Sequence, residues 1–114
     1  MQITSETVGR IAILAPSGEW DAAASPEFRD RWTGLFEQGS RHFIVDFLDV
    51  EFIDSSALSS LVSMFRRVNP TLNGQVRLTR VNEEVRRIFV ETRLDRVFDI
   101  YDSREDALVG LAEM

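Results

Sequence analysis

Two kinds of apolar pattern alternate along this chain, and this alternation limits the possible folds more than any other feature. The apolar run at residues 41–50 is rich in Phe, Ile and Val and predicts a buried strand. Further strands are predicted at residues 2–4, 8–20, 75–79 and 96–101. Between the strands, apolar residues recur at helical spacing, as they do from Phe28 to Phe36. This order predicts an α/β fold: one domain over residues 1–114, with a mostly parallel sheet of about four to five strands and about four helices packed on it.

Local signals mark several helix ends. Ser25-Pro26 predicts a helix start, with the serine as N-cap and the proline in the first turn. A second helix is predicted to begin after Asp54 and to end before Asn69-Pro70, because a proline disfavours helical geometry in the residue before it. Asn82 and Ser103 are predicted to cap two further helices.

The composition excludes several kinds of chemistry. All 13 basic residues are arginine, so a P-loop lysine and a Schiff-base lysine are ruled out. The chain has no cysteine and a single histidine, His42, which rules out disulfides, thiol nucleophiles and a histidine-based metal cluster. The net charge of −6 argues against nucleic acid or an anionic membrane as a partner. We therefore expect a binding protein without a cofactor rather than an enzyme.

The same composition bears on location and core. The first residues carry no signal-peptide pattern, and no apolar run reaches the ~18–20 residues of a membrane span. We therefore expect a cytoplasmic protein with no direct membrane insertion. His42 is expected at the surface at the start of a strand, whereas Trp20 and Trp32 are expected in the core.

The helix after Asp54 is unusually rich in serine. Its first nine positions hold Ser55, Ser56, Ser59, Ser60 and Ser63. Serine is a mediocre helix former, so helix propensity does not explain this density. Three of these serines share one face, opposite the apolar stripe, where small side chains let another backbone approach closely. That face is either a contact surface for a partner or a solvated surface with no role.

The Asp54-Ser55-Ser56 step stands at the carboxyl end of a predicted strand, the edge of an α/β sheet where binding sites gather. Asp54 or Ser55 alone would serve as N-cap, and a cap of this type contributes roughly 1 kcal/mol. A phosphate on Ser55 would meet the free N–H groups and the positive dipole end of the helix. It would add about −1.5 to −2 charge to a surface suited to close packing, which is the physics of an on/off binding switch.

Two enzyme-like alternatives fit the residues poorly. A catalytic serine needs a base, but the chain holds one histidine and no G-x-S-x-G motif around any serine. A two-component receiver domain would use Asp49 or Asp54 as its phosphorylated residue. It also needs a lysine late in the chain, and this chain has none.

The stretch "FIVDFLDVEFIDSSAL", residues 43–58, resembles the signature of the STAS domain, the fold of sulfate transporters and anti-sigma factor antagonists. Gly18-Glu19-Trp20-Asp21 is similar to the step that precedes the first helix of that family. Residues 82–108 resemble its C-terminal third, so the resemblance extends over nearly the whole chain. Two positions depart from the family pattern: Ala57 stands where glycine is usual, and Trp20 stands where a smaller apolar residue is usual.

The resemblance implies a bacterial anti-sigma factor antagonist that acts in transcription regulation by partner switching. Its unphosphorylated form would bind an anti-sigma factor, itself a serine-protein kinase, and so release a sigma factor. Phosphorylation at Ser55 would switch binding off, and a PP2C-type phosphatase would reverse it. ATP and metal would belong to these partners, and the chain itself would be a monomer or a weak dimer. The partner is expected to contact Asp21, Asp54, Ser56, Ala57, Ser59, Ser60 and Ser63.

Two further hypotheses remain open from the sequence. The chain could be a non-switched STAS scaffold, as an accessory subunit of a lipid-transport ATPase or a component of a stressosome. It could also be a small enzyme or ligand-binding domain that uses the sheet edge near Asp21 and Asp54.

Overall fold

The computed structural model describes residues 1–113, with the backbone alone for Thr71 and Leu72. Along them, single strands or pairs of strands alternate with helices. The strands are β1 (Gln2–Val8), β2 (Ile11–Trp20), β3 (His42–Asp46), β4 (Val50–Ile53), β5 (Val76–Thr79) and β6 (Asp99–Tyr101). The helices are α1 (Ser25–Glu37), α2 (Ser55–Leu72), α3 (Glu83–Glu91) and α4 (Arg104–Leu108), with short 3-10 turns η1 (Leu94–Arg96) and η2 (Leu111–Glu113).

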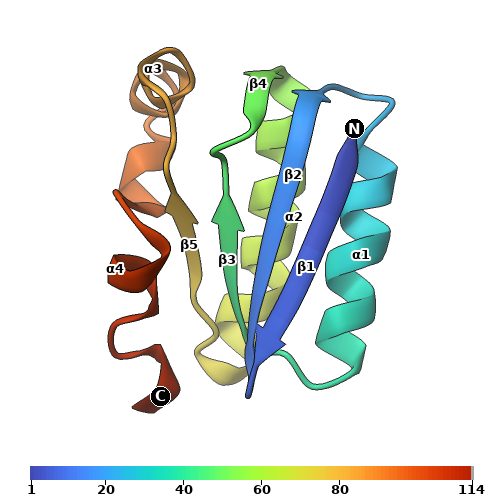
Figure 1. Cartoon of the computed structure of the whole chain (residues 1–114), viewed down its shortest axis with the longest axis vertical. Coiled ribbons are helices and arrows are strands. Elements are labelled where there is room, and N and C mark those ends of the chain that lie inside the picture. Colours follow the sequence, from blue (N-terminus) through green and yellow to red (C-terminus); the bar gives the residue numbers. More distant parts are fainter. Residues whose placement is uncertain (114) are drawn as a thin grey trace.

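The sheet is mixed but mainly parallel. Its strand order is β1-β2-β3-β5-β6, and only β1 runs antiparallel, as a hairpin partner of β2. The strand β4 pairs in parallel with the second half of β2, beyond the part that pairs with β3. The carboxyl ends of β2 and β4 therefore meet at one edge, where α1 and α2 begin (Figure 1).

Alternating residues of β2 divide the core between the two faces of the sheet. Ala12 and Leu14 pack with α1, α2 and α3 in the larger core, and Figure 1 shows α1 and α2 side by side on that face. Ile11 and Ile13 point to the other face and pack with α4 and η2 in a smaller core. Such alternation follows from the two-residue period of a strand that is covered on both sides. No helix of the described chain is both long and apolar enough to span a bilayer.

The predicted α/β architecture is confirmed, except that the apolar run at residues 41–50 was expected to form a single strand. Residues 41–50 form two strands rather than one, because the chain turns after β3: Val50 N–H donates to Phe47 O at 3.0 Å, and Leu48 N–H donates to the Asp46 carboxylate at 3.1 Å. This turn brings the described sheet to six strands, and β1 is longer than predicted, from Gln2 to Val8. A run that is apolar throughout carries no sign of where the chain bends.

The predicted end of the second helix is wrong. The helix α2 continues through Pro70 to Leu72, and Asn73 ends it in the left-handed conformation with φ 56°. A proline so near the C-terminus removes only one backbone hydrogen bond, and the helix continues past it. Asn69 Nδ2 donates to Gly74 O at 3.0 Å and ties this last turn to the chain that follows.

The predicted N-caps are confirmed at Asn82 and Ser103, whose side chains accept hydrogen bonds from Val85 N–H and Asp106 N–H. The cap of α1 differs from the prediction. Ala24 occupies the cap position, and the Asp21 carboxylate accepts from Ala24 N–H at 3.0 Å.

Both tryptophans lie in the core as predicted, with Trp20 0% and Trp32 4% exposed. The expectation for His42 is wrong: it starts β3 but is buried, and its Nδ1 accepts from Gln75 N–H at 3.1 Å. The sequence around it carries no sign that the backbone before β5 would supply this donor.

Candidate binding site

The pairing of β2 with β4 brings two aspartates to the same edge of the sheet. Trp20 lies opposite Ile53 in the register, and Asp54 N–H donates to Trp20 O at 3.2 Å. Asp21 and Asp54 each follow directly after these strand ends. Both are half-buried. The Asp21 carboxylate accepts from Ala24 N–H at the cap position of α1, and the Asp54 carboxylate accepts from Ser56 N–H in the first turn of α2.

Asp54 is the N-cap of α2. Its Oδ1 accepts from Ser56 N–H at 2.8 Å and forms a short hydrogen bond with the Ser56 hydroxyl. The hydroxyl of Ser56 is the main reason why the pKa of the Asp54 carboxyl lies below its ordinary value, and backbone N–H groups add to the effect against a cost from desolvation. Asp54 therefore stays ionised, and Ser56, unlike Ser55, is engaged by the cap.

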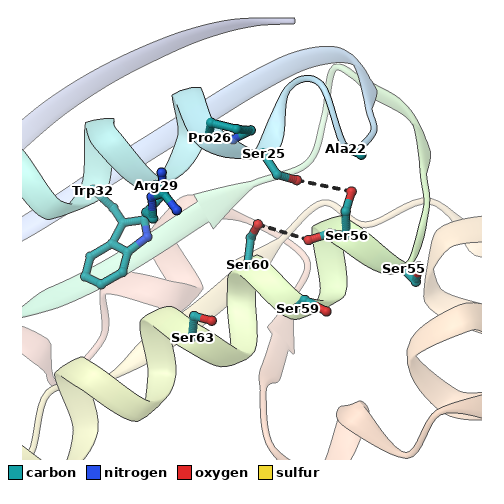
Figure 2. Close-up of a pocket in the computed structure, with 10 residues that line it drawn as sticks. All are labelled: Ala22, Ser25, Pro26, Arg29, Trp32, Ser55, Ser56, Ser59, Ser60 and Ser63. Atoms are coloured by element: carbon teal, nitrogen blue, oxygen red, sulfur yellow. Dashed lines mark hydrogen bonds between the residues drawn. The ribbon is translucent and has the colours of Figure 1, made fainter.

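A hydroxyl from α1 joins this cap. Ser25 Oγ lies 3.2 Å from Ser56 Oγ and 3.1 Å from Asp21 O, so its one proton can serve either acceptor (Figure 2). Ser60 Oγ donates to Ser56 O at 3.0 Å one turn further along α2. The first turns of the two helices are thus connected through side-chain hydroxyls.

Beyond this connection, α1 and α2 enclose an open groove of about 490 Å³. Its described lining comprises Ala22, Ser25, Pro26, Arg29, Trp32, Ser55, Ser56, Ser59, Ser60 and Ser63. Figure 2 shows the serines of α2 along one wall and Arg29 and Trp32 of α1 on the other. We call this cavity the serine groove.

The predicted site residues fall into three groups. Ser55, Ser59 and Ser63 are exposed along the serine groove, whereas Ser56 and Ser60 are half-buried in its wall. Asp21 and Asp54 stand at the adjoining edge of the sheet without lining the groove. Ala57 is the exception: it is 0% exposed and packs in the larger core, so its side chain does not belong to a contact surface.

Of the four α1 residues that line the groove, Ser25, Arg29 and Trp32 share one face of the helix. None of the three is predicted as a site residue: Ser25 is expected as a cap, Trp32 is expected in the core, and Arg29 has no assigned role. Their spacing of four and three residues places them on one face of a helix, and this signal was available. That this face lies against the serines of α2 is not visible in the sequence. Near the same edge, the apolar side chain of Phe52 is 52% exposed, and that of Leu48 is 57% exposed.

Another carboxylate at a strand end, that of Asp46, is buried in ion pairs and, unlike Asp54, is not open to a partner. Asp46, the last residue of β3, has a side chain that is 1% exposed and forms ion pairs with Arg80 and Arg104. Arg104 also pairs with Glu6 of β1 at 2.7 Å. Burial alone would raise the pKa of Asp46, but the hydrogen bonds from the two arginines outweigh it and hold the pKa below its ordinary value. We call these four residues the Asp46 cluster.

Neither carboxylate region resembles a metal site. Within residues 1–113, no three side chains among histidine and the acidic residues converge in a way that could hold an ion.

Comparison with known proteins places this geometry in context. The family model of the STAS domain matches residues 2–107. A Thermotoga neapolitana protein, provisionally named as an anti-sigma factor antagonist, is 31% identical over 100 residues, which cover 86% of this chain and 87% of that protein. The anti-sigma F factor antagonist of Paenibacillus polymyxa is 26% identical over 112 residues, 97% of this chain and 95% of its own length.

Solved structures share the fold. The anti-sigma factor antagonist SpoIIAA in its unphosphorylated form superposes with a TM-score of 0.84 at 21% identity, over 99% of this chain and 98% of its own. The Bacillus SpoIIAA structure in the phosphorylated form superposes with a TM-score of 0.74 at 19% identity, over 94% of this chain and 96% of its own.

Proposed function

This chain belongs to the STAS domain family, and on that premise we propose that it acts as an anti-sigma factor antagonist controlled by phosphorylation of Ser55. The unphosphorylated chain binds an anti-sigma factor that is also a serine-protein kinase, and a sigma factor is thereby released. The observation that carries the proposal is the exposed Ser55 hydroxyl at the start of α2, beside a carboxylate that stays ionised.

The two hydroxyls after Asp54 are unequal, and this supports Ser55 as the acceptor. The Ser56 hydroxyl donates to Asp54 and lies near Ser25, so transfer of a phosphoryl group to it would remove both hydroxyl contacts and place a second negative charge against the Asp54 carboxylate. Ser55 is exposed in the first turn and reaches solvent. A phosphate there meets the positive end of the helix dipole, so α2 tolerates the modification.

The same phosphate would oppose partner binding. In the free chain water solvates it, but in a closely packed interface it loses that water next to the carboxylate of Asp54. Removing a charge from water costs several kcal/mol unless a counter-charge is supplied. The switch is therefore electrostatic and needs no change of fold.

The proposed contact surface combines the exposed face of α2 with the nearby edge of the sheet. It comprises Asp21, Asp54, Ser56, Ser59, Ser60 and Ser63, and it excludes the buried Ala57. Phe52, opposite Glu19 in the register of β2 and β4, adds an exposed apolar side chain near this edge, and Leu48 is a second exposed apolar side chain. Side chains of this kind suit the buried centre of a protein–protein interface. In this proposal a PP2C-type phosphatase restores the unmodified serine, and the partners supply ATP and metal.

Binding of the cognate kinase-like anti-sigma factor, measured by calorimetry, tests the proposal. We expect Ser55→Ala to bind like the unmodified chain and Ser55→Asp to bind at least about tenfold more weakly, a difference of about 1.4 kcal/mol. Ser5→Asp adds the same charge on β1 and controls for net charge. Incubation of the wild type with the kinase and ATP should add one phosphate by intact mass, located at Ser55.

Equal affinity of Ser55→Ala and Ser55→Asp would reject the switch. If the chain instead co-purifies with a transport ATPase or a large assembly while Ser55 stays unmodified in cells, the non-switched scaffold is the better description.

A further inference from the structure

We propose that the serine groove between α1 and α2 is a binding site for a small hydroxylated organic anion, such as a sugar acid or a sugar phosphate. The site belongs to the free chain. It depends neither on Ser55 phosphorylation nor on an anti-sigma factor, so it can be tested without either.

The first argument is charge. The whole chain has 19 acidic and 13 basic residues, yet Arg29 is the one charged residue among the described residues that line the groove. Arg29 is exposed, and among the described residues its one ion pair is a loose contact, at 3.9 Å, with its exposed neighbour Asp30. The N-terminal turns of α1 and α2 also border the groove, and their dipoles favour negative charge. The positive charge of Arg29 and of the two helix N-termini therefore favours a negatively charged ligand.

The second argument is an unused hydrogen-bond donor. Trp32 is only 4% exposed, and its indole Nε1–H is buried without a partner among the described residues. Figure 2 shows the nitrogen-bearing edge of this ring turned across the groove towards Ser60. A buried N–H without an acceptor costs free energy, so a ligand that supplies an acceptor recovers it.

A comparison with Trp20 shows that a buried indole N–H without a partner is not in itself a sign of a ligand site. The Nε1–H of Trp20 also lacks a partner among the described residues, but its ring is fully buried against Phe28 and Phe47 and does not line the serine groove. The Trp32 ring borders the groove one helical turn after Arg29. A carboxylate or phosphate oxygen beside Arg29 would reach its buried nitrogen once the side chains that cover that atom move aside.

The hydroxyl groups indicate the rest of the ligand. Ser59 and Ser63 are exposed along the wall opposite Arg29 and Trp32, and a serine hydroxyl both donates and accepts. A groove of about 490 Å³ is within the size range of small-molecule sites. The ligand's anionic group would lie between Arg29 and Trp32, and its hydroxyls would bond to the serines of α2.

The two indole N–H signals of the ¹⁵N-labelled chain provide a test with an internal control. We expect ribose 5-phosphate or gluconate to shift the Trp32 indole signal in a saturable manner and to leave the Trp20 signal unchanged. Ribose, which lacks the charge, and inorganic phosphate, which lacks the hydroxylated carbon chain, serve as comparison probes and should bind more weakly.

Two arginines on α1 make a matched pair of variants. Arg29→Gln should weaken binding of the organic anion about tenfold, the effect expected from the loss of a charge-assisted hydrogen bond. Arg31→Gln removes the same charge from a residue that does not line the groove, and it should bind as the wild type does.

The proposal is overturned if neither organic anion shifts the Trp32 signal, or if Arg29→Gln and Arg31→Gln bind equally. Inorganic phosphate that binds as tightly as ribose 5-phosphate would reduce the groove to a site for an adventitious ion only. Ribose that binds as tightly would remove the anion requirement.

Discussion

Two aspartates stand at the carboxyl ends of β3 and β4, which are consecutive in the chain but do not pair with each other, and the two side chains have very different surroundings. Asp46 at the end of β3 is almost completely buried, and two arginines of its own chain hold it. Asp54 after β4 is half-buried, and its partners are the backbone and hydroxyl of Ser56. Both carboxyls have a pKa below the ordinary value, so each stays ionised.

This difference in surroundings separates a carboxylate that stabilises the fold from one that a binding partner can reach. We call the first a structural charge and the second an available charge. The Asp46 cluster connects β1, β3, the end of β5 and the start of α4, and its carboxylate is covered. Asp54 stands beside the exposed Ser55 and the open serine groove, where its carboxylate interacts electrostatically with any partner that binds there. A lowered pKa alone therefore does not identify a functional carboxylate in this fold. What matters is whether the groups that lower it leave the site open to a partner.

The largest effect is expected from a variant that removes the structural charge, Asp46. Asp46→Asn removes the negative charge that Arg80 and Arg104 share, and we expect a loss of about 3 kcal/mol in the free energy of unfolding. Urea unfolding measures it, and the exposed neighbour Asp49→Asn serves as control with little change. A loss below about 1 kcal/mol would show that solvent replaces the ion pairs and that the cluster is not structural.

The second prediction concerns pH. The folded-state pKa of Asp46 is lowered, so its contribution is fully present above the unfolded-state pKa of about 3.9 and is lost as the pH falls through the folded value. The free energy of unfolding of the wild type should begin to fall below about pH 5 and should keep falling as the pH drops through the lowered folded-state pKa. In Asp46→Asn this fall should be shallower. Parallel curves for the two proteins would remove Asp46 from the acid response.

The third prediction concerns Asp54, the available charge. Asp54→Ala removes the N-cap of α2 and should cost about a third of the Asp46→Asn loss, since a cap is worth less than a buried charge pair. Asp54→Asn should recover most of the loss, because asparagine is an equally good cap. If Asp54→Ala is as damaging as Asp46→Asn, Asp54 is also a structural charge.

The smallest expected effect tests the connection between the two helices. Ser25→Ala removes the hydroxyl that lies between Asp21 and Ser56, and should cost about 0.5–1 kcal/mol. Ser59→Ala, at an exposed position of α2, is the matched control, with stability unchanged or slightly raised because alanine is the better helix former. Equal effects of the two variants would mean that the Ser25–Ser56 contact carries no stability.

Much of the fold could be predicted because its signals are local. Helical spacing, strand alternation and the caps at Asn82 and Ser103 depend on residues within a turn or two of one another. The errors arose where the residue pattern gives no sign of the backbone conformation that the chain adopts. The apolar run through Phe47 hides a turn that backbone hydrogen bonds and the Asp46 carboxylate hold, and Pro70 lies within a helix that was expected to end before it.

The candidate site divides in the same way. The sequence by itself determined that Ser55 follows an aspartate at a strand end and that α2 carries a face of serines, because these are properties of consecutive residues. Only the tertiary structure decided that Arg29 and Trp32 of α1 form the other wall of the serine groove. It likewise brought Arg80 and Arg104, 34 and 58 positions from Asp46 in sequence, to one carboxylate. The physical reason is that the relative placement of two helices is set by the packing of the entire core, to which residues from every strand contribute.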